Sequence, residues 1–376
     1  MSDDDNLAVE RLRRARRATV HALTGLCVLF ALALLSGVVG AVLLFEAWLA
    51  TGLRKWWSAV LLALPGAVLA WLSLRLGRCL LVSNPLPAAQ RLSGSQAPSL
   101  RALIQETGRH FGDIRLDAVW ITGEMNAAVL QRPRWGFLGP IETHLLIGLP
   151  LAHSVSERQF GAILAHEFGH LARQRRGLAA WGCHLRAWWF RSADLCIERL
   201  PWLDGPLNRL TERGVMEAQQ LARIEEFEAD RAAAEVVGAP QVAEALVEMA
   251  TRERFLMEDF WVKVMAQCGQ RRRPSLRPYR DMGLGMVAGF LPAGRRASCD
   301  SEAGADSLHP SLAERLTALG QAPDAELRIE DSVAERHLAK LLPQLAWELD
   351  QRWWDGAREL WRAHRGQRRR SLPATN

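Results

Sequence analysis

The distribution of apolar residues divides the chain into an apolar N-terminal part and a mixed remainder. One uncharged run covers residues 22–45, and a second covers residues 56–74. At about 1.5 Å per residue, helices of these lengths extend roughly 36 and 28 Å, enough to cross the hydrocarbon core of a bilayer. The first run is too long for a cleaved signal peptide and ends without a small-residue cleavage site. We therefore predict a transmembrane hairpin over residues 22–82, preceded by a basic segment over residues 1–21.

Basic residues around the two runs predict the orientation of this hairpin. Several arginines lie within residues 11–17, Arg75 and Arg78 follow the second run, and the connecting loop holds only Arg54 and Lys55. Lys and Arg accumulate on the cytoplasmic side of membrane helices. The cysteines form no CxxC pair, which agrees with a reducing compartment. The sequence thus predicts an integral protein of the cytoplasmic (inner) membrane whose soluble part faces the cytoplasm.

Beyond residue 82 the apolar positions become short and periodic. A helix is expected over residues 99–111. Three short strands are expected over residues 116–122, 126–131 and 144–149, separated by Gly and Pro turn signals. From residue 156 onward nearly all of the chain has helical period. Strands early and helices late indicate an α+β fold, mostly helical, rather than a parallel α/β sheet.

The same patterns predict a soluble domain over residues 83–330, followed by a C-terminal helix and basic tail over residues 331–376. Residues 270–307 are rich in Gly, Pro and Arg and are expected to form a long mobile loop. The aromatic stretch 181–190 allows two interpretations. It is either an amphipathic helix that lies on the membrane or against the hairpin, or a segment of ordinary core packing.

Composition and charge exclude several classes of protein. With 49% hydrophobic and 23% charged residues, the chain is neither disordered nor fibrous, and its six cysteines are too few for a disulfide scaffold. The net charge of +6 is mild, and the arginine clusters lack interleaved aromatic platforms, so we expect no nucleic-acid partner. Membrane lipids are an expected partner, because these clusters could attract anionic headgroups. Ordinary solvated charge is the alternative.

Residues 161–171, GAILAHEFGHL, carry the pattern with the most chemistry. His166 and His170 lie one helical turn apart on the same face, so both imidazoles can reach one tetrahedral Zn²⁺. Glu167 is displaced from His166 by about 100° around the helix. There it could take a proton from a metal-bound water, whose pKa zinc lowers to about 7. A capping box at residues 154–157 is expected to start this helix, and two surface histidines without a metal are the alternative.

A third metal ligand has to come from elsewhere in the chain. The longer pattern HExxHxxGxxH would need a glycine and a histidine where the sequence has Arg173 and Arg176, so it is excluded. The remaining common solution is a Glu on a later helix, and residues 223–235, RIEEFEADRAAAE, are acidic and helical. Periodicity leaves the choice among Glu225, Glu226 and Glu228 open. Glu226 and Asp230 share one face, so one could bind the metal while the other accepts an N–H of a ligand histidine.

Together these residues resemble the M48 family of membrane-associated zinc metalloproteases, which includes HtpX-like and CAAX-processing enzymes. The family pattern E-[F/Y]-x-A-D matches residues 226–230, and a segment with His-Pro at its start and Arg at its end matches residues 309–315. The resemblance covers about residues 99–320 and implies a zincin fold of the gluzincin type. It implies Glu226 as the third zinc ligand and Asp230 as the partner of a ligand histidine. It also implies that His309 and Arg315 lie near the scissile carbonyl.

The family's N-A-[aromatic]-A stretch is partly kept at residues 126–129, NAAV. By resemblance, Asn126 and Ala127 belong to an edge strand beside the cleft, where an extended substrate could add as another strand. The expected function is a membrane-anchored zinc endopeptidase, with one Zn²⁺ per chain, acting on membrane or cytoplasmic proteins. The alternative is a catalytically silent, membrane-tethered scaffold with a structural zinc. Glu167 argues against that alternative, because a structural site does not need a base beside it.

Overall fold

The computed structural model describes residues 3–81, 89–93, 95–112, 114–135, 138–174, 177–269, 271, 273–288, 310–322 and 331–371. The chain is mostly helical, with one small mixed sheet, as the α+β prediction required. It divides into two compact units. The hairpin unit comprises Met1–Pro85, Arg132–Ile141 and Gln174–Ile224, and the sheet unit comprises Leu86–Gln131, Glu142–Arg173 and Glu225–Asn376. In this contact-based division residues 174–224 group with the hairpin and residues 331–376 group with the sheet unit, whereas the predicted domains are continuous stretches of sequence.

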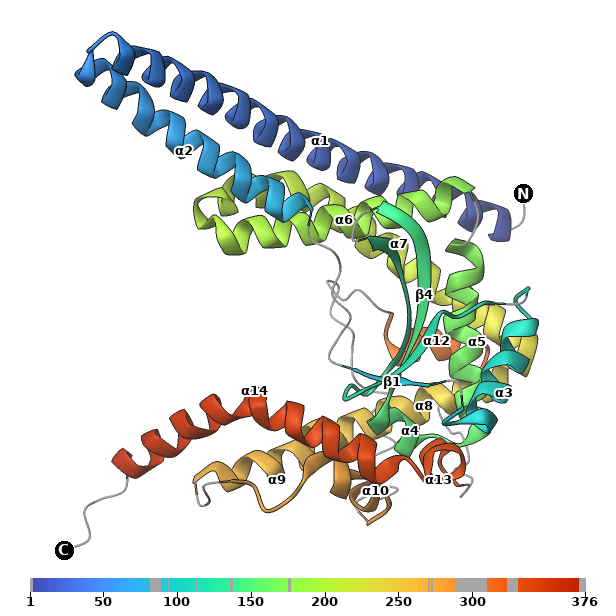
Figure 1. Ribbon diagram of the computed structural model, residues 1–376. Coiled ribbons are helices and arrows are strands. Elements are labelled where there is room, and N and C mark those ends of the chain that lie inside the picture. Colours follow the sequence, from blue (N-terminus) through green and yellow to red (C-terminus); the bar gives the residue numbers. More distant parts are fainter. Residues whose placement is uncertain are drawn as a thin grey trace, which may run out of the picture. The chain divides into compact units, whose positions relative to one another are not determined.

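The two apolar runs form helices α1 (Asp3–Gly52) and α2 (Trp56–Leu80), which lie side by side (Figure 1). Both are long and apolar enough to cross a membrane, over Ala8–Gly52 and Trp56–Leu80. They approach closely at Gly40, where a Cβ atom would lie 2.8 Å from the backbone nitrogen of Ala70. Small residues permit such contacts between membrane helices. The basic segment predicted before the hairpin is part of the same continuous helix as the first apolar run.

Helix α6 (Gly177–Arg199) contains the aromatic stretch whose interpretation the sequence left open. Its Trp189 is fully buried, and the ring lies against Gly25 of α1. Trp188 donates a hydrogen bond from Nε1 to the carbonyl oxygen of Leu80 at 2.8 Å. Within the described residues α6 therefore packs against the hairpin. A 3-10 turn, η1 (Pro201–Leu203), leads into the long helix α7 (Asp204–Val237).

The sheet has the strand order β1-β2-β4-β3. Its strands are β1 (Gln90–Leu92), β2 (Ala118–Thr122), β3 (Ala127–Trp135) and β4 (Leu138–Gly148). β1 pairs with β2 antiparallel, and β2 pairs with β4 in parallel, with Val119 opposite Leu145. The three predicted strands are present, although β3 and β4 are longer than expected, and β1 was not predicted. The sheet order places β3 at an edge, next to β4.

The core of the sheet unit forms where one face of the sheet packs against helices. Val119, Ile121, Leu145 and Ile147 supply the sheet side of this core. Short helices α3 (Pro98–Arg109) and α4 (Leu149–Ser154) precede α5 (Glu157–Gln174), whose Phe160 is fully buried in the same core. The end of α7 is followed by α8 (Ala239–Phe255), a π-helical turn η2 (Leu256–Phe260), α9 (Trp261–Ala266) and a 3-10 turn η3 (Gln267–Gly269).

The C-terminal part differs from the prediction in two segments. The expected loop over residues 270–307 contains helix α10 (Pro278–Ala288), which packs beside α14 (Leu342–Ser371) (Figure 1). Helix α14 continues to Ser371, so the basic tail expected within residues 331–376 is helical as far as that residue. Between them lie α12 (Leu312–Ala318) and α13 (Val333–Leu338), each started by a capping box. Residues 289–307 of the predicted loop lie outside the described residues.

The start of α5 also differs from the predicted cap. Ser156 and Gln159 form the reciprocal pair: the Ser156 N–H donates to Gln159 Oε1 at 2.9 Å, and the Gln159 N–H donates to Ser156 Oγ at 3.4 Å. Ser154 instead bonds to the carbonyl oxygen of Pro150 within α4. The capping box therefore begins two residues later than predicted, and it satisfies two backbone donors at the helix N-terminus.

Candidate metal centre

Helices α5 and α7 come unusually close at Gly169, the residue before the second histidine of the HExxH pattern. A Cβ atom on Gly169 would lie 3.2 Å from the Cβ of Ala232 and 3.4 Å from the Cα of Ala229. The small residues on both helices thus let the backbones approach. This contact brings the histidines of α5 to the acidic face of α7, and all of these residues belong to the sheet unit.

His166, His170 and Glu226 converge at this contact. The two imidazole Nε2 atoms lie 3.2 Å apart, and each lies 3.5 Å from one oxygen of the Glu226 carboxylate. A tetrahedral zinc with bonds of about 2.0–2.2 Å separates its ligand atoms by roughly 3.3–3.6 Å. The three residues could therefore hold a metal ion, and their separations fit zinc. Of the three glutamates that periodicity left open, the structure brings Glu226 to the histidines, while Glu228 contacts Arg173.

Asp230 and Arg315 form a second layer behind His166. Asp230 accepts a hydrogen bond from His166 Nδ1 at 2.9 Å, which leaves Nε2 free for a metal. Arg315 of α12 donates to both Asp230 oxygens, from Nε at 2.7 Å and from Nη2 at 2.6 Å. Burial would raise the pKa of Asp230, but the hydrogen bonds from Arg315 and His166 outweigh it and lower the pKa. The aspartate therefore stays ionised and holds the imidazole in place.

Glu167 lies beside the three donors. Its Oε2 accepts a hydrogen bond from the backbone N–H of Val129 in the edge strand β3, at 3.2 Å. Burial raises the pKa of the Glu167 carboxyl, although the imidazoles of His166 and His170 act in the opposite direction. A raised pKa brings a carboxylate closer to the range in which it can both accept and return a proton. The arrangement is therefore able to perform general acid–base chemistry at a bound water.

The surrounding carboxylates also affect His170. Burial lowers the pKa of its imidazole. The hydrogen bond with Glu226 and the charge of Glu167 raise that pKa by a larger amount, so the net shift is upward. The site therefore has a negative potential that favours a cation.

No protein-family model, curated protein or solved structure matched the chain in the comparisons. The chemistry of the site is consequently inferred from its geometry and from the residues themselves.

The remaining predicted site residues have different outcomes. Arg315 lines the cleft, and its guanidinium donates to both oxygens of Asp230. His309 lies outside the described residues. Asn126 directly precedes the edge strand β3 and Ala127 begins it, and both line the cleft that His166 and Glu167 also line. Asn126 also anchors the strand, because its carbonyl oxygen accepts the N–H of Gly148 at 2.8 Å.

This cleft, called the α5 cleft below, has a volume of about 370 Å³ and is bounded by the start of β3, α5, α7, α8 and Arg315. Sequence reasoning missed the contribution of α8, whose Val242, Leu246 and Met249 form one apolar wall. Their spacing of three and four residues indicated one helix face. The pattern carries no sign of whether such a face lines a cleft or fills a core.

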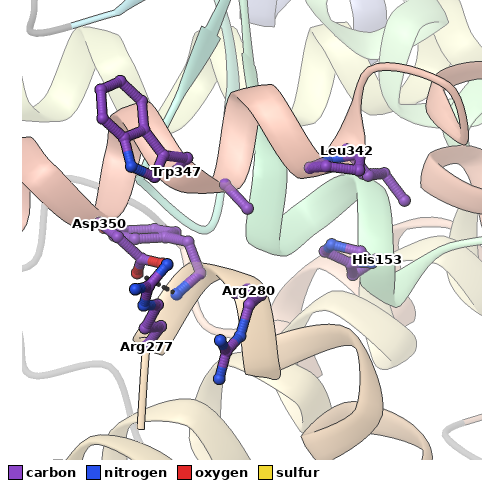
Figure 2. Close-up of a pocket in the computed structure, with 9 residues that line it drawn as sticks. His153, Arg277, Arg280, Leu342, Trp347 and Asp350 are labelled. Carbon is purple, nitrogen blue, oxygen red and sulfur yellow. Dashed lines mark hydrogen bonds between the residues drawn. The ribbon is translucent and has the colours of Figure 1, made fainter.

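A second cleft, called the α14 cleft, is larger, at about 450 Å³. Figure 2 shows residues around it, with Trp347 and Asp350 from α14, Arg280 from the first turn of α10, Arg277 just before that helix, and His153 from α4. Asp350 accepts a hydrogen bond from the backbone N–H of Tyr279 at 2.9 Å and so caps the N-terminus of α10. No metal-ligand group was found here among the described residues, which leaves the α5 cleft as the candidate site.

Proposed function

We propose that the protein is a membrane-anchored zinc endopeptidase. The observation that carries the proposal is the convergence of His166, His170 and Glu226, with donor atoms within 4.8 Å of one another and Glu167 beside them. Two imidazoles and one carboxylate are the ligand set of catalytic zinc sites, which keep a fourth position open. A zinc ion bound there would polarise the scissile carbonyl and make the attacking water more acidic.

Glu167 is the proposed general base and acid. Its carboxylate takes a proton from the water that attacks the carbonyl carbon, and the same carboxyl then gives a proton to the leaving amine as the C–N bond breaks. The Val129 N–H holds one carboxylate oxygen and so fixes the orientation of this side chain. Asp230 and Arg315 act indirectly, since they keep the His166 ring turned toward the metal position.

The edge strand β3 is the proposed binding surface for the substrate backbone. It lies at the edge of the sheet, and its first residues line the α5 cleft. An extended peptide could add to such an edge by main-chain hydrogen bonds, which supply affinity without dependence on sequence. Protein segments in an extended conformation, from membrane or cytoplasmic proteins, are therefore the proposed substrates.

The hairpin α1–α2 is the proposed membrane anchor. Both helices are long and apolar enough to span a bilayer, and exposed tryptophans such as Trp48 and Trp57 lie near their connection, where interfacial aromatics are common. The excess of basic residues at the two far ends of the hairpin supports the cytoplasmic side of the inner membrane for the sheet unit.

Metal content and proteolysis of the full-length protein in detergent test this proposal. We expect Glu167→Gln to keep zinc but lose casein cleavage, because the ligands remain and the base is gone. His166→Ala should lose both. His110→Ala is the matched control, since His110 is an exposed residue at the end of α3 and should leave both readouts unchanged. Equal zinc content in the wild type and in His166→Ala would contradict the metal site. Full zinc with no cleavage by the wild type would favour a structural metal instead.

A further inference from the structure

One face of α8 lines the α5 cleft. Val242, Ala245, Leu246, Met249 and Glu253 all line the cleft, at spacings of three and four residues. The four apolar residues form a continuous wall, and Glu253 follows Met249 by one helical turn. At about 1.5 Å per residue, the side chains of Met249 and Glu253 leave the helix roughly 6 Å apart along its axis. The cleft thus combines an apolar wall with one acidic end.

Within the part of the chain that the structure describes, Glu253 differs from the other acidic residues of α8 in having no hydrogen-bond or ion-pair partner. Glu244 accepts a hydrogen bond from Gln159 at 3.0 Å, and Glu248 pairs with Arg252 at 2.8 Å. Among the described residues, no hydrogen bond or ion pair involves the Glu253 side chain, which is exposed in the cleft.

The arginines next to Glu253 in sequence do not neutralise it either. Arg252 bonds to Glu248 and to the carbonyl oxygen of Met286, and Arg254 pairs with Glu258 at 2.9 Å. The other charges of the cleft balance one another once a divalent ion is present, because Glu167, Glu226 and Asp230 then face that ion and Arg315. Among the described residues that line the cleft, Glu253 is therefore the charge without a counterpart, and it is open to a bound chain.

We propose that the cleft selects an extended polypeptide segment with a bulky apolar residue against the Leu246–Met249 wall and a Lys or Arg residue against Glu253. This inference rests on the proposed peptidase function and names its substrate class. In an extended chain, side chains two residues apart lie on the same face and about 6.6–6.8 Å apart. That separation matches the spacing of Met249 and Glu253. The selected pattern is therefore an apolar and a basic residue separated by one residue of any type.

The proposal can be tested with short unstructured peptides and zinc-loaded, full-length Glu167→Gln protein in detergent, which should bind peptides without cutting them. Each peptide contains one Leu and one test residue, which is Lys, Gln or Glu. The test residue lies two positions before or two positions after Leu. A further peptide places Lys one residue from Leu, which turns the two side chains to opposite faces. Affinity is measured by fluorescence anisotropy, and cleavage of the same peptides by the wild type is measured in parallel.

We expect the peptide with Lys two residues from Leu to bind about two- to fivefold more tightly than the Gln peptide, as for a partly exposed ion pair. The advantage should disappear when Lys is moved by one residue and should shrink at high salt. Glu253→Lys should invert the order and favour the Glu peptide. Glu258→Lys is the matched control, because it makes the same charge change five residues away and outside the cleft lining, and it should leave the order unchanged.

The possible failures are distinguishable. An unchanged peptide order in Glu253→Lys, with normal cleavage by the wild type, would overturn this inference and leave the peptidase function intact. An equal shift in Glu253→Lys and Glu258→Lys would also overturn it, because the effect would then come from the general field of the protein. Absence of both binding and cleavage by zinc-loaded protein would overturn the peptidase function and this inference with it.

Discussion

The two clefts of the sheet unit contain the same kinds of residue and yet differ in their electrostatics. Each has a buried aspartate, a histidine and at least one arginine: Asp230 with His166 and Arg315 in the α5 cleft, and Asp350 with His153 and two arginines in the α14 cleft. In the α5 cleft, side-chain donors lower the pKa of Asp230 in spite of burial. In the α14 cleft, burial raises the pKa of Asp350 more than the backbone N–H groups of Tyr279 and Arg280 lower it.

The difference lies in what the charged groups contact. Arg315 donates to both oxygens of Asp230, whereas Arg280 in the α14 cleft pairs with Asp281 and leaves Asp350 to the backbone. His166 faces both a carboxylate and a second imidazole, whereas His153 packs over Gly283, and burial lowers the pKa of its ring. Cavity size and residue type therefore do not identify a chemical site. Convergence of charged side chains on one another does, and the smaller cleft has it.

The largest expected effect comes from removing Arg315. Arg315→Met would leave the Asp230 carboxylate, which is 1% exposed, without its bidentate partner. Breaking a buried pair by deleting one member costs about 3–5 kcal/mol, and loss of a residue that supports a metal ligand lowers metal affinity by about 10- to 100-fold. Thermal unfolding of the metal-free protein and zinc titration measure the two effects.

Arg173→Met provides the control for that experiment. Arg173 also joins α5 to α7, through Glu228, but its side chain is 35% exposed, so its loss should cost at most about 1 kcal/mol. The double variant Arg315→Met with Asp230→Asn should recover part of the stability, because no buried charge then remains unpaired. Equal losses in Arg315→Met and Arg173→Met would show that burial does not distinguish the two pairs.

A smaller effect is expected from the two glycines of α5. Gly169→Ala places a methyl group 3.2 Å from Ala232 and should separate α5 from α7, since overpacking costs about 1–3 kcal/mol. Gly161 has no atom near its missing side chain, so Gly161→Ala should stabilise the helix by about 0.5–1 kcal/mol. Zinc affinity should fall in Gly169→Ala and stay constant in Gly161→Ala. A rise in melting temperature in both variants would mean that the close contact does not position the ligands.

These glycines also mark how far the sequence could predict the site. The pair His166 and His170 followed from helical period alone, because the two positions share a face of one helix. The choice of Glu226 over Glu225 and Glu228 came only from the resemblance to a family pattern and not from helical period, because it depends on how α7 is rotated against α5. That rotation is set by the contact of Gly169 with Ala229 and Ala232, which no pattern within either helix contains.

The fold also contains elements that local sequence predicted and features that depend on contacts between distant segments. Strong local signals, such as the uncharged runs of α1 and α2 and the alternation of β2, predicted their elements correctly. Helix α10 was missed because it lies in residues 270–307, which are rich in Arg, Gly and Pro, and because its N-terminal cap comes from Asp350, 71 residues after Tyr279. For Arg315 the resemblance implied a place near the scissile carbonyl, and the structure adds hydrogen bonds to Asp230, a contact between distant segments that local pattern does not show.

The smallest expected effect is a difference in how the stability of Asp350 and Asp230 variants depends on pH, which compares the electrostatics of the two clefts. A folded-state pKa that is raised, as for Asp350, stabilises the fold at low pH, and this stabilisation is lost as pH rises from the unfolded value, about 3.9, through the folded pKa. Asp350→Asn keeps an oxygen for the Tyr279 N–H but cannot ionise. Its stability relative to the wild type should therefore increase over that pH window and then remain constant.

The stability of Asp230→Asn in metal-free protein, relative to the wild type, should change with pH in the opposite direction. The pKa of Asp230 is lowered in the folded state, so ionised Asp230 stabilises the fold above the unfolded pKa. This stabilisation is lost as pH falls through the folded pKa. Unfolding measured across acidic to neutral pH for the wild type and both variants tests the signs, and parallel curves for the two variants would contradict the assignment of opposite electrostatics to the two clefts.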